Sequence, residues 1–208
     1  MPRAAGRVLR TFPWPEVGIA SGLAAALFAA ATALTSSIGF WLVLLALAGC
    51  GGAAAYVLDE ASGPVVDASP TSRRRRFGWR LGLVVVPAAV GVVGLAMVGT
   101  ADPAVPWRRL LLVLAGYLAI GVMTAAVLRS RGRAAPGDLA AVVVALGTSL
   151  VVLVDPLHQW VPVLPYDVAG WSRTAALWIL TIVACVGAVI VGLRDPAAAP
   201  LLPRRTRH

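Results

Sequence analysis

The chain has 208 residues, of which 59% are hydrophobic and only 13% charged, and its formal net charge is +9. A soluble domain of this size needs more charge to cover its surface. The apolar residues of a soluble domain also do not gather into runs of about 20, the length of a membrane-spanning helix, as they do in this chain. The basic residues are all arginine and flank apolar runs, which favours a role in membrane orientation and argues against nucleic-acid binding.

Six apolar runs follow one another along the chain, and each predicts a transmembrane helix. The predicted spans are residues 17–34, 38–58, 81–98, 110–128, 139–154 and 174–193. The fold class is therefore an all-α, polytopic membrane protein, with residues 1–208 as a single transmembrane domain. We expect a short N-terminal interfacial segment and an uncleaved first helix, because the first run is long for a signal peptide; cleavage near residues 35–37 is the alternative.

The arginines divide unequally between the two sides of this layout. One side carries 15 of them: Arg3, Arg7, Arg10, Arg73, Arg74, Arg75, Arg76, Arg80, Arg129, Arg131, Arg133, Arg194, Arg204, Arg205 and Arg207. The other side carries Arg108, Arg109 and Arg173. The positive-inside rule then places both termini in the cytoplasm. Arginine without any lysine is typical of a GC-rich bacterial genome, so we expect the spans to lie in a bacterial plasma membrane.

The first span and the second contain small residues at the spacing that lets helices approach closely in lipid. Gly18 and Gly22 form such a pair in the first span, and Ala48 and Gly52 form one in the second. Packing within the chain is the leading interpretation, and contact with a second subunit is the alternative. Pro87 predicts a kink in the third span.

The cytoplasmic connection, residues 59–80, is long enough to carry a function. Ser69 before Pro70 predicts the start of a short basic helix that continues through Thr71 and Arg73–Arg76 into the third span. Two interpretations of the arginines stay open. They either hold the chain's orientation near anionic lipid headgroups, or they dock a cytoplasmic subunit.

The external connection, residues 155–173, is apolar, aromatic and proline-rich, so we expect it to lie at the outer interface. It serves either as a gate over a central path or as a passive cap. The candidate gate residues are His158, Trp160, Tyr166 and Trp171.

Catalytic chemistry has little support in this sequence. No Asp, Glu, Lys, Arg or His falls deep in a predicted span, where a proton relay or ion-coupled carrier needs one. There is no phosphate-binding loop for ATP, and His158 and His208 are too isolated for a zinc motif. We therefore predict no catalytic residue, metal or cofactor. A membrane enzyme acting on lipid is the weakest alternative, with only Asp59, Glu60, Asp138 and Asp155 as candidate acids; Asp138 is interpreted as the N-cap of the fifth span.

The layout resembles the permease subunits of actinobacterial ABC-type exporters and their permease-like relatives. Three short stretches carry the resemblance: Tyr56-Val-Leu-Asp59-Glu60, then Ala68-Ser69-Pro70-Thr71 with its arginine run, and Leu193-Arg194-Asp195-Pro196-Ala197 after the last span. In that family the cytoplasmic helix couples to an ATPase and the external segment helps to close the path. The resemblance implies that residues 69–76 form the coupling segment.

The functional hypothesis is a permease-like subunit of an ATP-driven transporter. It would form its path with a second membrane subunit, the same chain or another, and a separate cytoplasmic ATPase would power it. The alternative is a non-catalytic accessory or assembly subunit of a larger membrane complex.

Overall fold

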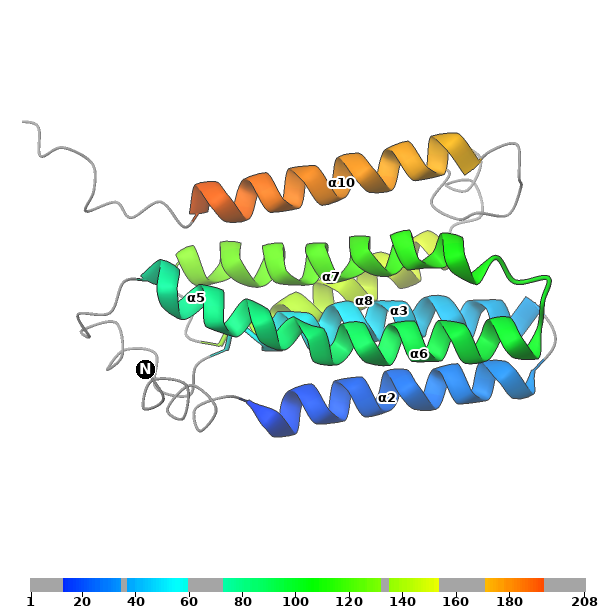
Figure 1. Ribbon diagram of the computed structural model, residues 1–208. Coiled ribbons are helices and arrows are strands. Elements are labelled where there is room, and N and C mark those ends of the chain that lie inside the picture. The colour runs from blue at the N-terminus through cyan, green and yellow to red at the C-terminus, as the bar shows by residue number, and fades with distance from the viewer. Residues whose placement is uncertain (1–12, 35–36, 60–72, 132–134, 154–170, 193–208) are drawn as a thin grey trace, which may run out of the picture.

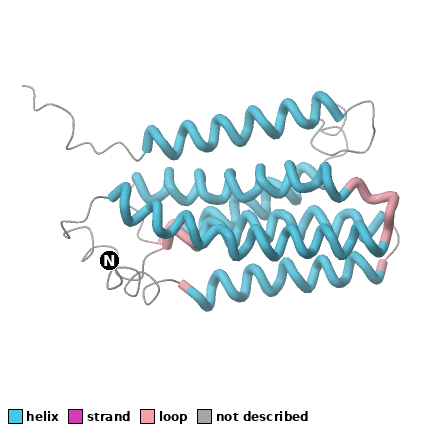
Figure 2. The backbone as a smooth tube through the Cα atoms, viewed as in Figure 1, coloured by secondary structure: helices cyan, strands magenta, loops and turns pink. Residues whose placement is uncertain are grey.

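The computed structural model describes residues 13–34, 37–59, 73–131, 135–153 and 171–192, and these ranges contain helices joined by short loops (Figure 2). The helices are α2 (Trp14–Ala33), α3 (Ser37–Tyr56), α5 (Arg73–Leu81), α6 (Val85–Ala101), α7 (Trp107–Ser130), α8 (Gly137–Leu153) and α10 (Trp171–Gly192); a 3-10 turn, Gly82–Val84, joins α5 to α6.

Five helical stretches in the described residues are long and apolar enough to cross a membrane. Four of them are α2, α3, α7 and α10, and the other runs from the end of α5 through α6, over Phe77–Ala101. The prediction of an all-helical chain is confirmed for the described residues, and these five helices are consistent with a multi-pass membrane protein. The predicted fifth span corresponds to α8, whose 17 residues reach about 25 Å at the helical rise, short of a hydrocarbon core about 30 Å thick.

The long helices form a bundle in which each runs antiparallel to the one before it in the chain (Figure 1). As a result, the start of α2 and the end of α10 lie at the same end of the bundle. This end also holds α5, the last turn of α7 and the first turn of α8, and we call it the basic end because Arg80, Arg129 and Arg131 lie there. The opposite end holds the Asp102–Pro106 loop and the first turn of α10.

Helix α3 is the centre of the bundle, since it packs against α2, α6, α7 and α8. Residues 46–55 are buried apart from the half-buried Gly49, and small side chains such as Ala46, Cys50 and Ala53 let the neighbouring helices approach it. In contrast, α10 lies at the edge and packs chiefly on α7. Its outward face exposes Leu180 and Val183, which suits contact with lipid.

Helix α5 meets α6 at an angle, and the 3-10 turn lies at this bend (Figure 1). Pro87 is buried in the first turn of α6 and has no N–H to donate to the carbonyl of residue 83, which accounts for the local change of helix type. The exposed Trp79 on α5 and the exposed Trp14 on α2 lie at the basic end, the depth that indole rings prefer at a membrane interface.

Candidate functional site

The carboxyl end of α3 is capped by two arginines from other helices. After Tyr56 the chain makes a tight turn, in which the N–H groups of Leu58 and Asp59 donate to the carbonyls of Ala55 and Tyr56. Carbonyls at the end of a helix have no partner within it and need one from elsewhere. Arg129 at the end of α7 donates to the Leu58 carbonyl at 2.5 Å, and Arg80 of α5 donates to the Asp59 carbonyl. Positive charge at a helix carboxyl terminus also offsets the helix dipole.

The side chain of Asp59 joins α3 to the start of α8. Its Oδ1 accepts the backbone N–H of Gly137 at 2.7 Å. The approach is close enough that any side chain at residue 137 would collide with the Asp59 carboxylate and the Tyr56 ring. Beside it, the Tyr56 hydroxyl donates to Oδ1 of Asp138 at 3.0 Å, which makes a second link between the same two helices.

These residues connect four helices at the basic end, and we call them the polar junction. Its members are Tyr56, Leu58, Asp59, Arg80, Arg129, Gly137 and Asp138. Within the junction Asp59 is only 9% exposed and Arg80 only 3%. Burial of polar groups at this depth is stable only because each is hydrogen-bonded.

The surroundings of Asp59 favour its protonated form. Burial raises the pKa of the Asp59 carboxyl to about 6, because the charged form loses its hydration. The Gly137 amide and the Arg129 charge pull the pKa down, while the carboxylates of Asp138 and Glu16 push it up. The junction therefore contains a group that can bind a proton near neutral pH.

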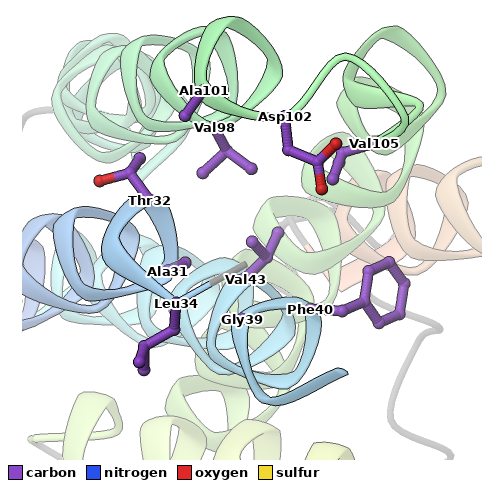
Figure 3. Close-up of a pocket in the computed structure, with 10 residues that line it drawn as sticks. All are labelled: Ala31, Thr32, Leu34, Gly39, Phe40, Val43, Val98, Ala101, Asp102 and Val105. Atoms are coloured by element: carbon purple, nitrogen blue, oxygen red, sulfur yellow. The ribbon is translucent and has the colours of Figure 1, made fainter. Parts of the chain in front are cut away.

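The opposite end of the bundle has a small pocket of about 80 Å³ between α2, α3 and α6 (Figure 3). Val43 and Val98 face one another across it, and Thr32 and Asp102 supply its polar side chains. Asp102 is already used locally, since its Oδ1 accepts the N–H of Ala104 at 3.0 Å. The pocket has room for a few water molecules and is too small for an organic substrate.

No family model matches this chain. Searches of curated proteins and of solved structures also found no match. The resemblance to exporter permeases therefore stays a hypothesis, based on short sequence stretches and on layout.

The predicted coupling segment lies only partly in the described residues. Ser69, Pro70 and Thr71 fall outside them, whereas Arg73–Arg76 form the first part of α5. The later part of α5 is fixed to the bundle, since Phe77 packs on a buried cluster and Arg80 is a member of the polar junction.

Of the predicted gate residues, His158, Trp160 and Tyr166 lie outside the described residues. Trp171 begins α10, and the Arg109 guanidinium of α7 lies over its ring at 5.4 Å from the centroid. This contact ties the start of α10 to the start of α7.

The two small-residue pairs lie in different surroundings. Ala48 and Gly52 are buried in α3, and a Cβ added to Gly52 would touch the Cβ of Ala141 in α8 at 3.4 Å. Gly18 and Gly22 are exposed on α2, with no atom within 4 Å of an added Cβ. The first pair packs within the chain, while the second faces the surroundings of the bundle.

Sequence reasoning treated the members of the polar junction as separate features. Arg80 and Arg129 counted only toward orientation, and Asp59 counted as a scattered acid and as part of the Tyr56–Glu60 stretch that resembles exporter permeases. Asp138 lies within the first turn of α8, which begins at Gly137, and it accepts a bond from Tyr56 instead of acting as a simple N-cap. The one available signal was Asp59 itself, a carboxylate directly after an apolar run.

In the described residues, no three His, Cys, Asp or Glu side chains come together in a way that could hold a metal ion. Cys50 and Cys185 are both buried and both free. The polar junction can therefore form hydrogen bonds, hold the positive charges of its arginines and bind a proton at Asp59.

Proposed function

We propose that this chain is a permease-like membrane subunit of an ATP-driven transporter, in which α5 passes movement from a cytoplasmic ATPase to the bundle. The observation that carries the proposal is the chain of contacts from α5 to α8. Arg80 of α5 donates to the main chain at Asp59, and the Asp59 side chain accepts the first amide of α8. A displacement of α5 would thus reach α3 and α8 directly, without a flexible linker between them.

The proposed topology has six crossings with both termini in the cytoplasm. The antiparallel succession of α2, α3, α6, α7, α8 and α10 supports an even number, and the basic end supports the orientation. In this topology α8 crosses with little tilt or at a locally thinned bilayer.

We propose further that the transport path forms between this chain and a second membrane subunit. The middle of α3 is packed against its neighbours, and the pocket at the opposite end holds about 80 Å³. The close packing around α3 supports a path at an interface between two subunits, and the proposal assigns ATP hydrolysis to the cytoplasmic partner.

Co-purification tests the proposal. The tagged full chain, extracted from its native membrane, should bring down an ATPase. Replacing each of Arg73–Arg76 by glutamate should reduce the recovered ATPase at least tenfold, while the matched control Arg108→Glu, at the opposite end, should leave it unchanged. Recovery of no ATPase, or equal recovery with all variants, would contradict the proposal.

A topology measurement is needed beside it, because reversing four arginines can invert a membrane protein. In a background with Cys50→Ala and Cys185→Ala, a membrane-impermeant maleimide should label Asp102→Cys in intact cells. Ser130→Cys, at the end of α7, should react only after the membrane is opened. The same pattern in the Arg73–Arg76 variant shows that its orientation is kept.

An accessory or assembly subunit is the second candidate. The closely packed interior of the bundle and the wide apolar face of α10 favour it, since both suit a subunit that supports other membrane chains. Recovery of membrane proteins without an ATPase in the same experiment would decide for it.

A further inference from the structure

We propose that Asp59 is a proton-binding group that controls how tightly the start of α8 closes on the end of α3. The proposal concerns a conformational device at the basic end and holds whether or not the chain takes part in transport. It starts from the position of the carboxylate, which lies between the end of α3 and the start of α8 within the polar junction.

The first step is the geometry of the closed state. Asp59 Oδ1 is 2.7 Å from the Gly137 nitrogen, and the missing side chain of Gly137 lets the amide reach this buried carboxyl. Gly137 is the first residue of α8, so this bond, together with the Tyr56–Asp138 bond, joins the start of α8 to the end of α3.

The second step is the set of charged and titratable groups around Asp59. Asp138 of α8 and Glu16 of α2 raise the pKa of Asp59, because their negative charges repel an ionised Asp59 carboxylate. Tyr56 of α3 is uncharged near neutral pH and donates its hydroxyl to Asp138. In contrast, Arg129 of α7 favours a charged Asp59. Arg80 of α5 faces the same turn and donates to the Asp59 carbonyl.

The third step is what ionisation does to the junction. A charged Asp59 in the closed state is poorly hydrated and repelled by Asp138 and Glu16, and opening the junction restores water to it. The neutral form has no such drive and still accepts the Gly137 N–H through its carbonyl oxygen. Loss of the proton therefore favours opening, and binding of the proton favours closure.

The size of the effect follows from linkage. The pKa of Asp59 is about 6 in the closed junction, against the ordinary value of 3.8 when water reaches it. These two values predict about tenfold more opening at pH 7.5 than at pH 5.

Hydrogen exchange of the full chain in lipid nanodiscs, followed by mass spectrometry, measures this opening at residues 137–142. After correction for the intrinsic exchange rate, protection of these amides should fall about tenfold between pH 5 and pH 7.5. Asp59→Asn should abolish the change. The matched control Asp102→Asn, which removes a carboxylate that also accepts a backbone N–H, should leave it intact.

A second variant tests the proposal in case Asp59→Asn does not fold. Glu16→Gln changes an exposed side chain and removes one of the charges that raise the Asp59 pKa, so the loss of protection should move to lower pH. The proposal is overturned if protection at residues 137–142 does not change with pH, or if the change keeps its size in a folded Asp59→Asn. If Asp59→Asn does not fold, an unchanged midpoint in Glu16→Gln overturns it.

Discussion

Trp178 of α10 covers Gly116 of α7, and no side chain at residue 116 would leave room for its indole ring. The same indole packs against Tyr117, with ring centroids 5.4 Å apart. Because α10 packs chiefly on α7, the packing of the Trp178 indole against the backbone at Gly116 holds α10 on the bundle.

We expect Gly116→Ala to destabilise the protein by about 1–3 kcal/mol, because the added methyl forces the indole or the helix to move. Thermal unfolding in detergent measures the change. Gly187→Ala on α10 is the matched control, since an added Cβ there meets nothing within 4 Å. Equal midpoints for the two variants would show that Trp178 does not fix α10.

The crossing of α3 and α7 predicts a stronger response to the same substitution. A Cβ on Gly121 would run into the carbonyl of Gly51, a backbone atom that cannot rotate away. Gly121→Ala should therefore destabilise the bundle by about 3 kcal/mol or more, while Gly18→Ala and Gly22→Ala, on the open face of α2, should not. If the Gly18 and Gly22 variants lose stability only in a concentration-dependent way, that face contacts a second chain.

The pH dependence of global stability has a defined sign. The pKa of Asp59 is raised from 3.8 to about 6, so the folded chain binds this proton more tightly than the unfolded chain. The stabilisation is complete below pH 3.8 and is lost as the pH rises through 6. The midpoint temperature of unfolding of the wild type should decrease as the pH is raised from 4.5 to 7, and this decrease should be smaller in Asp59→Asn. An increase in the midpoint temperature over this pH range would contradict the assignment.

The cation–π contact between Arg109 and Trp171 should contribute about 0.5–1 kcal/mol to the docking of α10. A double-mutant cycle with Arg109→Gln and Trp171→Leu measures the coupling energy. Arg108 is the matched control, because its guanidinium lies 5.5 Å from the ring of Trp107, its neighbour in the same helix. Coupling no larger than for the Arg108–Trp107 pair would mean that Arg109 does not tie the two helices.

The amino-acid sequence by itself determined where the helices run and which end carries the arginines. Peptide groups in hydrocarbon must bond within their own segment, so each apolar run can only be a helix, and its charged ends mark its limits. The predicted bounds consequently lie within a few residues of α2, α3, α7, α8 and α10.

Only the tertiary structure decided which faces meet. Helices in lipid are apolar on the side that packs and on the side that faces lipid, so periodicity does not separate the two sides. For this reason the exposed Gly18 and the buried Gly52 have the same sequence signature, and the hydrogen bond between Asp59 and Gly137 joins residues 78 positions apart. The polar junction exists because four helix ends converge there, and that convergence is set by packing around α3.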